Sequence, residues 1–354
     1  MNPILPLPDP IPAPAWIFHI LELVFFTAHI LLMNIVVGGA CIALYSKLTR
    51  RRPHPAFDDQ FTSILPTVFA IAVNMGVAVL LFVQVLFGHL IYTSSILMAT
   101  YWLLVVPALV LGYYAIYGYG KASARAVAAA AIGLALILFL AIGFAFVQNF
   151  TMMMHPDLWA AYFSTRNGTV LNPPDASLLP RYLHFVVASL AIGGLFTAAA
   201  WTIRKRRGRE GSDEMIQRGL TVFGVATLVQ IATGFWFLFS LKQEYMLQFM
   251  GKNPAATIAL WLGLLCGIGA VAAALGRQFR ATIIMISVTL VAMVFVRDEL
   301  RTMYLRGVFD TSSLAVTPQN GVLLIFVATL IVGLGVMAWM VKAGFRSSGR
   351  RTAP

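Results

Sequence analysis

The 354-residue sequence predicts an all-α polytopic membrane protein with nine transmembrane helices, arranged as two similar four-helix bundles and one further helix. Hydrophobic residues make up 60% of the chain and charged residues only 11%, and the mean hydropathy is +0.84. The apolar runs are long enough to cross a bilayer repeatedly, and a prominent motif occurs twice. These observations exclude a soluble globular domain.

The repeated motif is a histidine nine residues before a pair of glycines, inside an apolar run that ends in cations. The two copies are His29 with Gly38-Gly39 and His184 with Gly193-Gly194, followed by the related triplets Thr67-Val68-Phe69 and Thr221-Val222-Phe223. The two copies are offset by about 154 residues in both segments, which indicates an internal repeat.

The apolar runs define nine predicted spans whose connections alternate in charge. The spans are 15–45, 63–92, 96–120, 126–154, 180–203, 215–241, 254–276, 280–306 and 321–343. The cations gather in every second connection and in the C-terminal tail, at 47–52, 121–125, 204–209, 277–280 and 342–351. By the positive-inside rule, the N-terminus lies outside a bacterial inner (plasma) membrane and the C-terminus in the cytoplasm.

Four helices per copy give both copies the same orientation, so the bundles should be related by an axis along the membrane normal. The predicted division is an outer lead-in at 1–14, a first bundle at 15–154, an outer linker loop at 155–179, a second bundle at 180–307, and a ninth helix with a basic inner tail at 308–354.

Charge, cysteine content and the N-terminal residues restrict the function further. The net charge of +12 follows the inner loops, so we expect no nucleic-acid partner. Cys41 and Cys266 lie in apolar runs without a Cys-x-x-Cys-His motif, which excludes covalent c-type haem. No cation precedes Lys47, so the start lacks the basic region of a cleaved signal peptide.

The repeated histidines should lie at one depth, in the outer part of the hydrocarbon. His29 comes 18 residues before Lys47, and His184 comes 20 residues before Arg204. A neutral imidazole in hydrocarbon needs a partner, such as haem iron, a proton path, a quinone or a neighbouring helix. Repetition at equivalent positions favours haem b, in two or more copies, with His29 and His184 as the iron ligands.

Other polar residues near the outer boundary are second-rank candidates for cofactor binding. Arg181 lies one turn outward of His184, where it either pairs with haem propionates or snorkels to the interface. Glu22 and His19 share one stripe of the first span, so Glu22 is either functional or paired with an imidazole. His89 and His155 also fall near this boundary, whereas His54 belongs to an inner basic loop and should be solvated.

Three further features have both a functional and a structural interpretation. The glycine pairs face away from the histidines, which favours close helix packing. Met152, Met153 and Met154 either supply an axial thioether or pack at a helix end. The charged residues 297–301 either anchor propionates, contact a partner, or form a solvated helix end.

Several motifs together carry a family resemblance. They are His29 with Val37-Gly38-Gly39, Phe69-x-x-x-x-Asn74-Met75-Gly76-Val77, Phe87-Gly88, Gln148-Asn149, Leu171-Asn172-Pro173, and His184 with Ala188-Ser189 and Gly193. Over about residues 20–205 the chain resembles subunit I of the cytochrome bd quinol oxidases. The resemblance implies that His29 is an axial ligand of one haem at the oxygen-reducing centre. It implies that His184 is an axial ligand of the low-spin haem b, which accepts electrons from quinol.

The chain departs from this family at the positions of the oxygen chemistry. The third span reads Ala99-Thr100-Tyr101 and Val106-Pro107-Ala108 where the family has two glutamates. Residues 259–262 lack the family's methionine ligand, and the long quinol loop is reduced to roughly Lys242–Asn253. Loss of the carboxylates disfavours oxygen reduction, and His19, His89 and His155 could replace missing ligands in closed bis-histidine sites.

The sequence therefore favours a membrane-embedded b-type cytochrome that passes electrons between the quinone pool and a redox protein at the outer face, such as a c-type cytochrome. Other membrane subunits are expected to join it. Two alternatives stay open: a divergent bd-type terminal quinol oxidase subunit I, and a haem-free transporter or membrane anchor.

Overall fold

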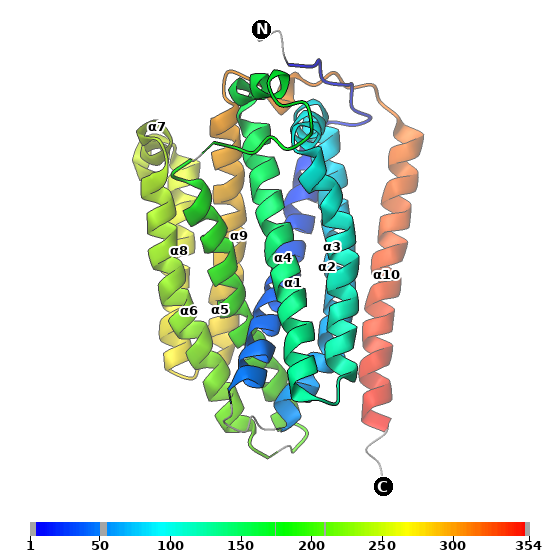
Figure 1. The fold of residues 1–354 in the computed structure, drawn as a ribbon, viewed down its shortest axis with the longest axis vertical. Coiled ribbons are helices and arrows are strands. Elements are labelled where there is room, and N and C mark those ends of the chain that lie inside the picture. Colours follow the sequence, from blue (N-terminus) through cyan, green and yellow to red (C-terminus); the bar gives the residue numbers. More distant parts are fainter. Residues whose placement is uncertain (1–4, 50–54, 174, 209, 351–354) are drawn as a thin grey trace.

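The computed structural model describes residues 5–49, 55–173, 175–208 and 210–350, and within these ranges it consists of helices and connecting loops. The long helices run roughly side by side along one axis (Figure 1). They are α1 (Ala15–Leu48), α2 (Pro55–Leu97), α3 (Ala99–Lys121), α4 (Arg125–Met154), α5 (Leu178–Lys205), α6 (Ser212–Ser240), α8 (Pro254–Leu275), α9 (Phe279–Leu305) and α10 (Asn320–Arg350).

Eight of these helices, α1 to α6, α8 and α9, are long and apolar enough to cross a membrane. This confirms the polytopic all-α fold class, with helix bounds close to those expected from hydropathy. In α10, the apolar stretch within the searched residues is the shorter segment Asn320–Val336. The ninth span therefore stays a prediction, as does the division of the chain into the five segments given above.

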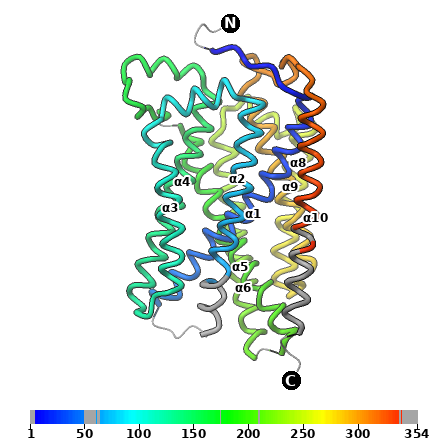
Figure 2. Tube along the Cα trace, turned by 90° about the vertical axis from the view of Figure 1, so that its right-hand side faces the viewer, coloured from blue at the N-terminus to red at the C-terminus, as the bar shows by residue number. Residues whose placement is uncertain are grey.

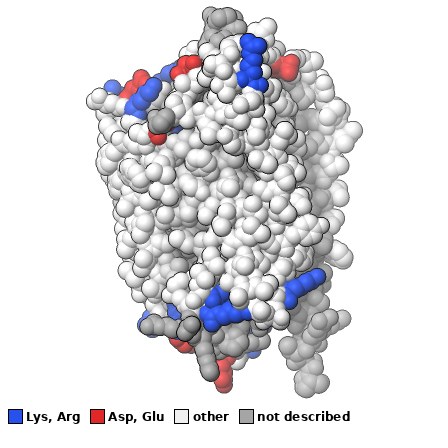
Figure 3. Space-filling model, in the orientation of Figure 1, with Lys and Arg blue, Asp and Glu red and all other residues white. Residues whose placement is uncertain are grey.

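The surface of the bundle separates into an uncharged belt and two charged ends. Lys, Arg, Asp and Glu side chains gather at the two ends, while the face between them is almost free of charge (Figure 3). The start of α1 and the end of α10 lie at opposite ends of the bundle (Figure 1). An uncharged belt of this kind fits the hydrocarbon layer of a membrane. Which end faces the cytoplasm stays a prediction from the inner cations.

The first glycines of the two repeated motifs meet at the crossing of α1 and α5. A Cβ added to Gly38 would lie 1.9 Å from the carbonyl oxygen of Ser189 and 3.0 Å from the Cα of Gly193. A Cβ added to Gly193 would lie 2.7 Å from the carbonyl carbon of Gly38. The two backbones can approach this closely only without side chains, which confirms the packing interpretation of the glycine pairs.

The second glycine of each motif packs against the helix that follows it in the chain. Gly39 faces the side chains of Phe61 and Leu65 on α2, and Gly194 faces the backbone of Gly219 and Phe223 on α6. Both copies of the repeat therefore use their glycine pair in the same way. The first glycine packs at the crossing of α1 and α5, and the second packs against the helix that follows its own.

The outer linker loop folds back over the ends of α2 and α4. It begins with η1 (Pro156–Phe163), and the indole of Trp159 donates a 2.9 Å hydrogen bond to the carbonyl of Met152. The side chain of Asn172 donates to the backbone carbonyl of Gln148 at 2.7 Å, and the Val170 N–H donates to the Leu97 carbonyl at 3.1 Å. These bonds satisfy the loop's polar groups where helix ends would otherwise leave them unpaired.

The N-terminal lead-in pairs with the connection between α9 and α10, and both lie at the end of the bundle where α1 begins (Figure 2). Ile11 and Val316 form an isolated parallel bridge, and the Ile11 N–H donates a 2.8 Å bond to the Ala315 carbonyl. The connection from α6 to α8 is compact as well, consisting of α7 (Gln243–Leu247) and η2 (Gln248–Lys252). This connection is therefore short, as the sequence indicated.

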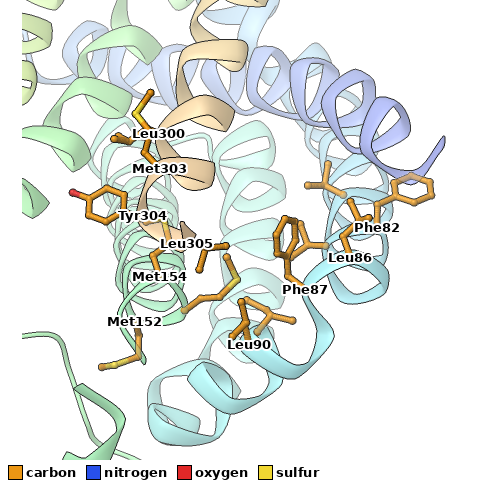
Figure 4. Packing of buried hydrophobic residues seen from close by; sticks show 14 of the residues in the cluster. Phe82, Leu86, Phe87, Leu90, Met152, Met154, Leu300, Met303, Tyr304 and Leu305 are labelled. Atoms are coloured by element: carbon orange, nitrogen blue, oxygen red, sulfur yellow. The ribbon is translucent and has the colours of Figure 1, made fainter. Parts of the chain in front are cut away.

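A hydrophobic cluster fills the bundle beneath these outer connections (Figure 4). Met152, Met153 and Met154 are buried in it, close to Leu300 and Met303 of α9. Their side chains lie among apolar neighbours, which supports the packing interpretation of the methionines. Helix α2 bends at Phe87, where φ is −130° and ψ is 27°, so its last turns lean over the same cluster.

Candidate functional site

His29 on α1 is held by two features of α2. Its Nδ1 lies 2.8 Å from the backbone carbonyl of Ala72, and Gly76 lies one turn further along the same helix. A Cβ added to Gly76 would lie 2.6 Å from the His29 Cε1, so the imidazole occupies the space a side chain would need. With Nδ1 donating to the carbonyl, the lone pair of Nε2 is free to bind a metal.

His184 on α5 has a closely similar setting against α6. A Cβ added to Gly234 would lie 3.0 Å from the His184 Cε1, and the backbone carbonyl of Gln230 lies one turn before this glycine on the side of Nδ1. The Nδ1 is buried and closes no hydrogen bond with any described residue. Both imidazoles therefore face a carbonyl and a glycine separated by one turn of the following helix.

The two settings fit haem ligation. A metal-bound histidine commonly donates its other ring N–H to a backbone carbonyl, which fixes the ring and raises its basicity. In both settings a glycine of the next helix lies against the ring, where a side chain would collide with the imidazole. The Nδ1 of His184 is buried and closes no hydrogen bond among the described residues, and the backbone of Gln230 is near the imidazole. The residues present are thus compatible with an iron porphyrin at each histidine.

Near the outer end of α1 lies a buried ionic cluster. Glu22 accepts two hydrogen bonds from Arg301 of α9, at 2.6 and 2.9 Å. Arg301 also contacts Asp298, and Asp298 accepts a 2.9 Å contact from the Nε2 of His19. Arg301 lies with its guanidinium carbon 4.3 Å from the ring centre of Phe87.

The ionic cluster changes two expectations from the sequence. Glu22 pairs with an arginine and not with an imidazole, because α9 approaches α1 from a distant part of the chain. Asp298 and Arg301 are buried, so the end of α9 is no solvated helix terminus. His19, Glu22 and Asp298 bring three potential metal ligand atoms within 4.8 Å of one another. Arg301 already contacts both carboxylates, so this group is best described as an ion-pair network.

Arg181 lies one turn outward of His184, at the place the sequence indicated. It is 9% exposed, and its guanidinium donates to the hydroxyls of Thr151 at 3.0 Å and Ser177 at 3.3 Å. The aromatic rings of Phe237 and Tyr304 flank it at 5.2 and 5.9 Å. Its Nε has no hydrogen-bond partner in the described part of the chain. The snorkelling alternative does not describe this inward-packed side chain.

His89 and His155 are both partly buried against aromatic side chains. The ring of His89 meets the edge of Phe309 at 4.4 Å, and the ring of His155 meets Tyr304 at 5.1 Å. Burial lowers the pKa of His155 from its ordinary value, so its imidazole is neutral at pH 7.

A small cavity of about 130 Å³ opens beside His155 at the ends of α4, α6 and α9. Its lining residues are Thr151, His155, Asp157, Leu158, Asn172, Pro173, Asp175, Ser240, Lys242 and Tyr304. Thr151 and Tyr304 are also contacts of Arg181. The cavity therefore lies next to the guanidinium that precedes His184.

Sequence reasoning missed three parts of this site. Gly76 was noted only as part of a family motif, and Gly234 was not noted. The pairing of Glu22 with Arg301 joins residues 279 positions apart, which no local pattern reports. A signal for the glycines does exist in the sequence, because each lies on the helix that follows its histidine.

The sequence matches no known protein family and no relative among curated proteins. The structure is similar to a chain of the bd oxidase from Geobacillus thermodenitrificans, with a TM-score of 0.70 and 12% sequence identity. The likeness covers 96% of this chain and 99% of that chain. This chain is therefore a polytopic membrane protein with a bd-oxidase-like fold, as the resemblance over residues 20–205 implied.

Proposed function

We propose that this protein is a membrane-embedded b-type cytochrome that passes electrons between the quinone pool and a redox protein at the outer face of a bacterial inner membrane. The observation that carries the proposal is the equivalent setting of His29 and His184. Each ring faces a backbone carbonyl and a glycine of the next helix. A solute carrier or a simple anchor gives no reason for this duplicated arrangement.

In the proposed protein, His29 and His184 would each hold the iron of a haem b group, and Arg181 would hold a propionate of the haem at His184. The bound haems would supply reversible one-electron transfer across the outer half of the bundle. The chain holds each imidazole in one orientation and excludes water with apolar helices. His19, His89 and His155 stay second-rank candidates for further iron ligands. Glu22 would act by holding Arg301 in position.

The outer cavity is a suitable place for a quinone headgroup. It lies beside Arg181, so an electron would travel a short path from the cavity to the haem at His184. His155 is neutral and lies at the cavity, where it can accept a proton released by a quinol. The cavity's mouth carries Asp157, whose side chain is 75% exposed, and acidic groups of this kind favour a basic partner such as a c-type cytochrome.

The second candidate is a divergent terminal quinol oxidase, favoured by the fold shared with a bd oxidase. Helix α3 contains no Asp or Glu, and its stretch around Val106 is exposed on the bundle surface. Proton delivery to a buried oxygen site normally uses carboxylates, which disfavours this candidate.

A reduced-minus-oxidised optical spectrum of the purified protein tests both candidates. Sharp low-spin b-type bands that carbon monoxide does not shift support the electron-transfer protein. Bands that shift with carbon monoxide support the oxidase. A colourless preparation would contradict both and leave the haem-free transporter or anchor.

A further inference from the structure

Two arginine side chains have buried N–H groups without a hydrogen-bond partner among the described residues. One is Arg181, whose Nε is unpaired among the described residues. The other is Arg297 of α9, whose buried Nη1 closes no hydrogen bond there. The Oε1 of Glu22 lies 3.7 Å from this Nη1, which is beyond hydrogen-bond distance. Both guanidiniums therefore have capacity for a further acceptor.

Each arginine lies at the helical turn that precedes one of the two repeated histidines. Arg181 precedes His184 by three residues, which places it one turn outward on the same face of α5. Arg297 stacks over Phe26, with its guanidinium carbon 4.1 Å from the ring centre, and Phe26 precedes His29 by three residues. A second ring, that of Phe150 on α4, lies 5.5 Å away. The arginine near His184 therefore comes from the same helix, α5, whereas the arginine that contacts Phe26 of α1 comes from α9.

The carboxylates near Arg297 are engaged by other partners. Glu22 and Asp298 both contact Arg301, and Asp298 also contacts His19. The Nη1 of Arg297 stays 3.7 Å from Glu22 and closes no hydrogen bond among the described residues. A buried donor without an acceptor is costly. Arg297 can therefore donate to one further acceptor, which an anionic group from outside the chain would supply.

We propose that Arg297 binds a propionate carboxylate of the haem ligated by His29, and that the Glu22–Arg301 pair holds Arg297 in position. This inference rests on the proposed function, because it requires a haem at His29. The walls fit such a group: Phe26 and Phe150 give flat apolar surfaces, and the cations lie only on the outward side of the imidazole. A phosphate of a membrane lipid has the same anionic oxygens, so the test must separate the two sources.

The test compares Arg297→Gln with Arg297→Lys and with Arg306→Gln, a matched control at an exposed position just beyond α9. Four quantities are measured on each purified protein: the haem-to-protein ratio, the midpoint potential of each haem, the propionate bending band in the resonance Raman spectrum, and the bound phospholipid. In Arg297→Gln, one midpoint potential should shift downward, because a cation that disfavours the ferric state is removed. The propionate band of the same haem should shift as well.

Arg297→Lys keeps the charge and loses the planar fork. It should keep the midpoint potential near that of the wild type while the propionate band still shifts. If Arg297→Gln does not yield folded protein, the propionate band of Arg297→Lys still tests the proposal. Arg306→Gln should match the wild type in all four quantities.

The outcomes separate this inference from the proposed function. A wild-type protein without haem would contradict the proposed function itself. A haem-loaded Arg297→Gln protein with unchanged potentials and an unchanged propionate band would overturn only the role of Arg297. Loss of bound phospholipid with both haem properties unchanged would overturn it in favour of a lipid phosphate.

Discussion

The hydroxyl of Ser189 donates a 2.9 Å hydrogen bond to the side-chain oxygen of Asn34, and the two residues occupy equivalent positions in the repeat. Each lies five residues after its histidine, Asn34 after His29 and Ser189 after His184. Both are buried, with the glycine crossing of α1 and α5 one turn further along. This bond therefore joins α1 to α5 one turn before their glycine crossing.

Replacing either repeated histidine should remove one haem. We expect His184→Ala and His29→Ala each to lower the haem-to-protein ratio by one equivalent, because no other side chain presents an imidazole at that position. Quantitative haem extraction measures this. His54→Ala, which lies outside the described residues and belongs to a predicted inner loop, is the control. Unchanged haem content in His184→Ala would rule out that assignment.

The glycine beneath His29 should tolerate no side chain. In Gly76→Ala, the new Cβ would meet the His29 ring at 2.6 Å, and the hydrogen bond to Ala72 keeps the ring from moving aside. We expect a loss of roughly 1–3 kcal/mol in stability or an altered spectrum of one haem. Gly224→Ala, with no atom within 4 Å of the added Cβ, is the matched control on α6. Thermal unfolding in detergent and the optical spectrum should both separate the two variants.

The crossing of α1 and α5 should also tolerate no added side chain. A Cβ at Gly38 would lie 1.9 Å from a backbone oxygen, so Gly38→Ala must separate the helices and break the bond between Ser189 and Asn34. We expect destabilisation of about 3 kcal/mol or more, seen as a lower Tm. Gly118→Ala, whose Cβ would make an ordinary 3.8 Å contact, should keep the wild-type Tm. Equal Tm values for both variants would contradict the close approach.

The ion pair between Glu22 and Arg301 should contribute strongly to the free energy of unfolding. Glu22→Gln leaves a buried guanidinium with one fewer carboxylate, which typically costs about 3–5 kcal/mol. Arg301→Gln should be similarly destabilising, and the double variant should lose less than the sum of the two single variants. A double-mutant cycle on Tm or denaturant stability measures this. Strict additivity would show that the two side chains do not interact.

The sequence by itself determined the fold class and most helix bounds to within a few residues, although α2 (Pro55–Leu97) extends beyond the expected 63–92 at both ends. Hydropathy and loop charge depend only on local composition, so spans such as α4 were predicted almost to their ends. The repeat offset also placed His29 and His184 at one depth, and their fit to haem remains a prediction that extraction can test.

Only the tertiary structure decided which residues surround these histidines. Contacts between helices depend on the rotation and crossing of each helix, and neither is written in local composition. The Ala72 carbonyl, the space above Gly76, the pairing of Glu22 with Arg301, and the stacking of Arg297 on Phe26 all join different helices. A stripe on one helix can show that a polar residue needs a partner, but the partner comes from whichever distant helix packs against that face.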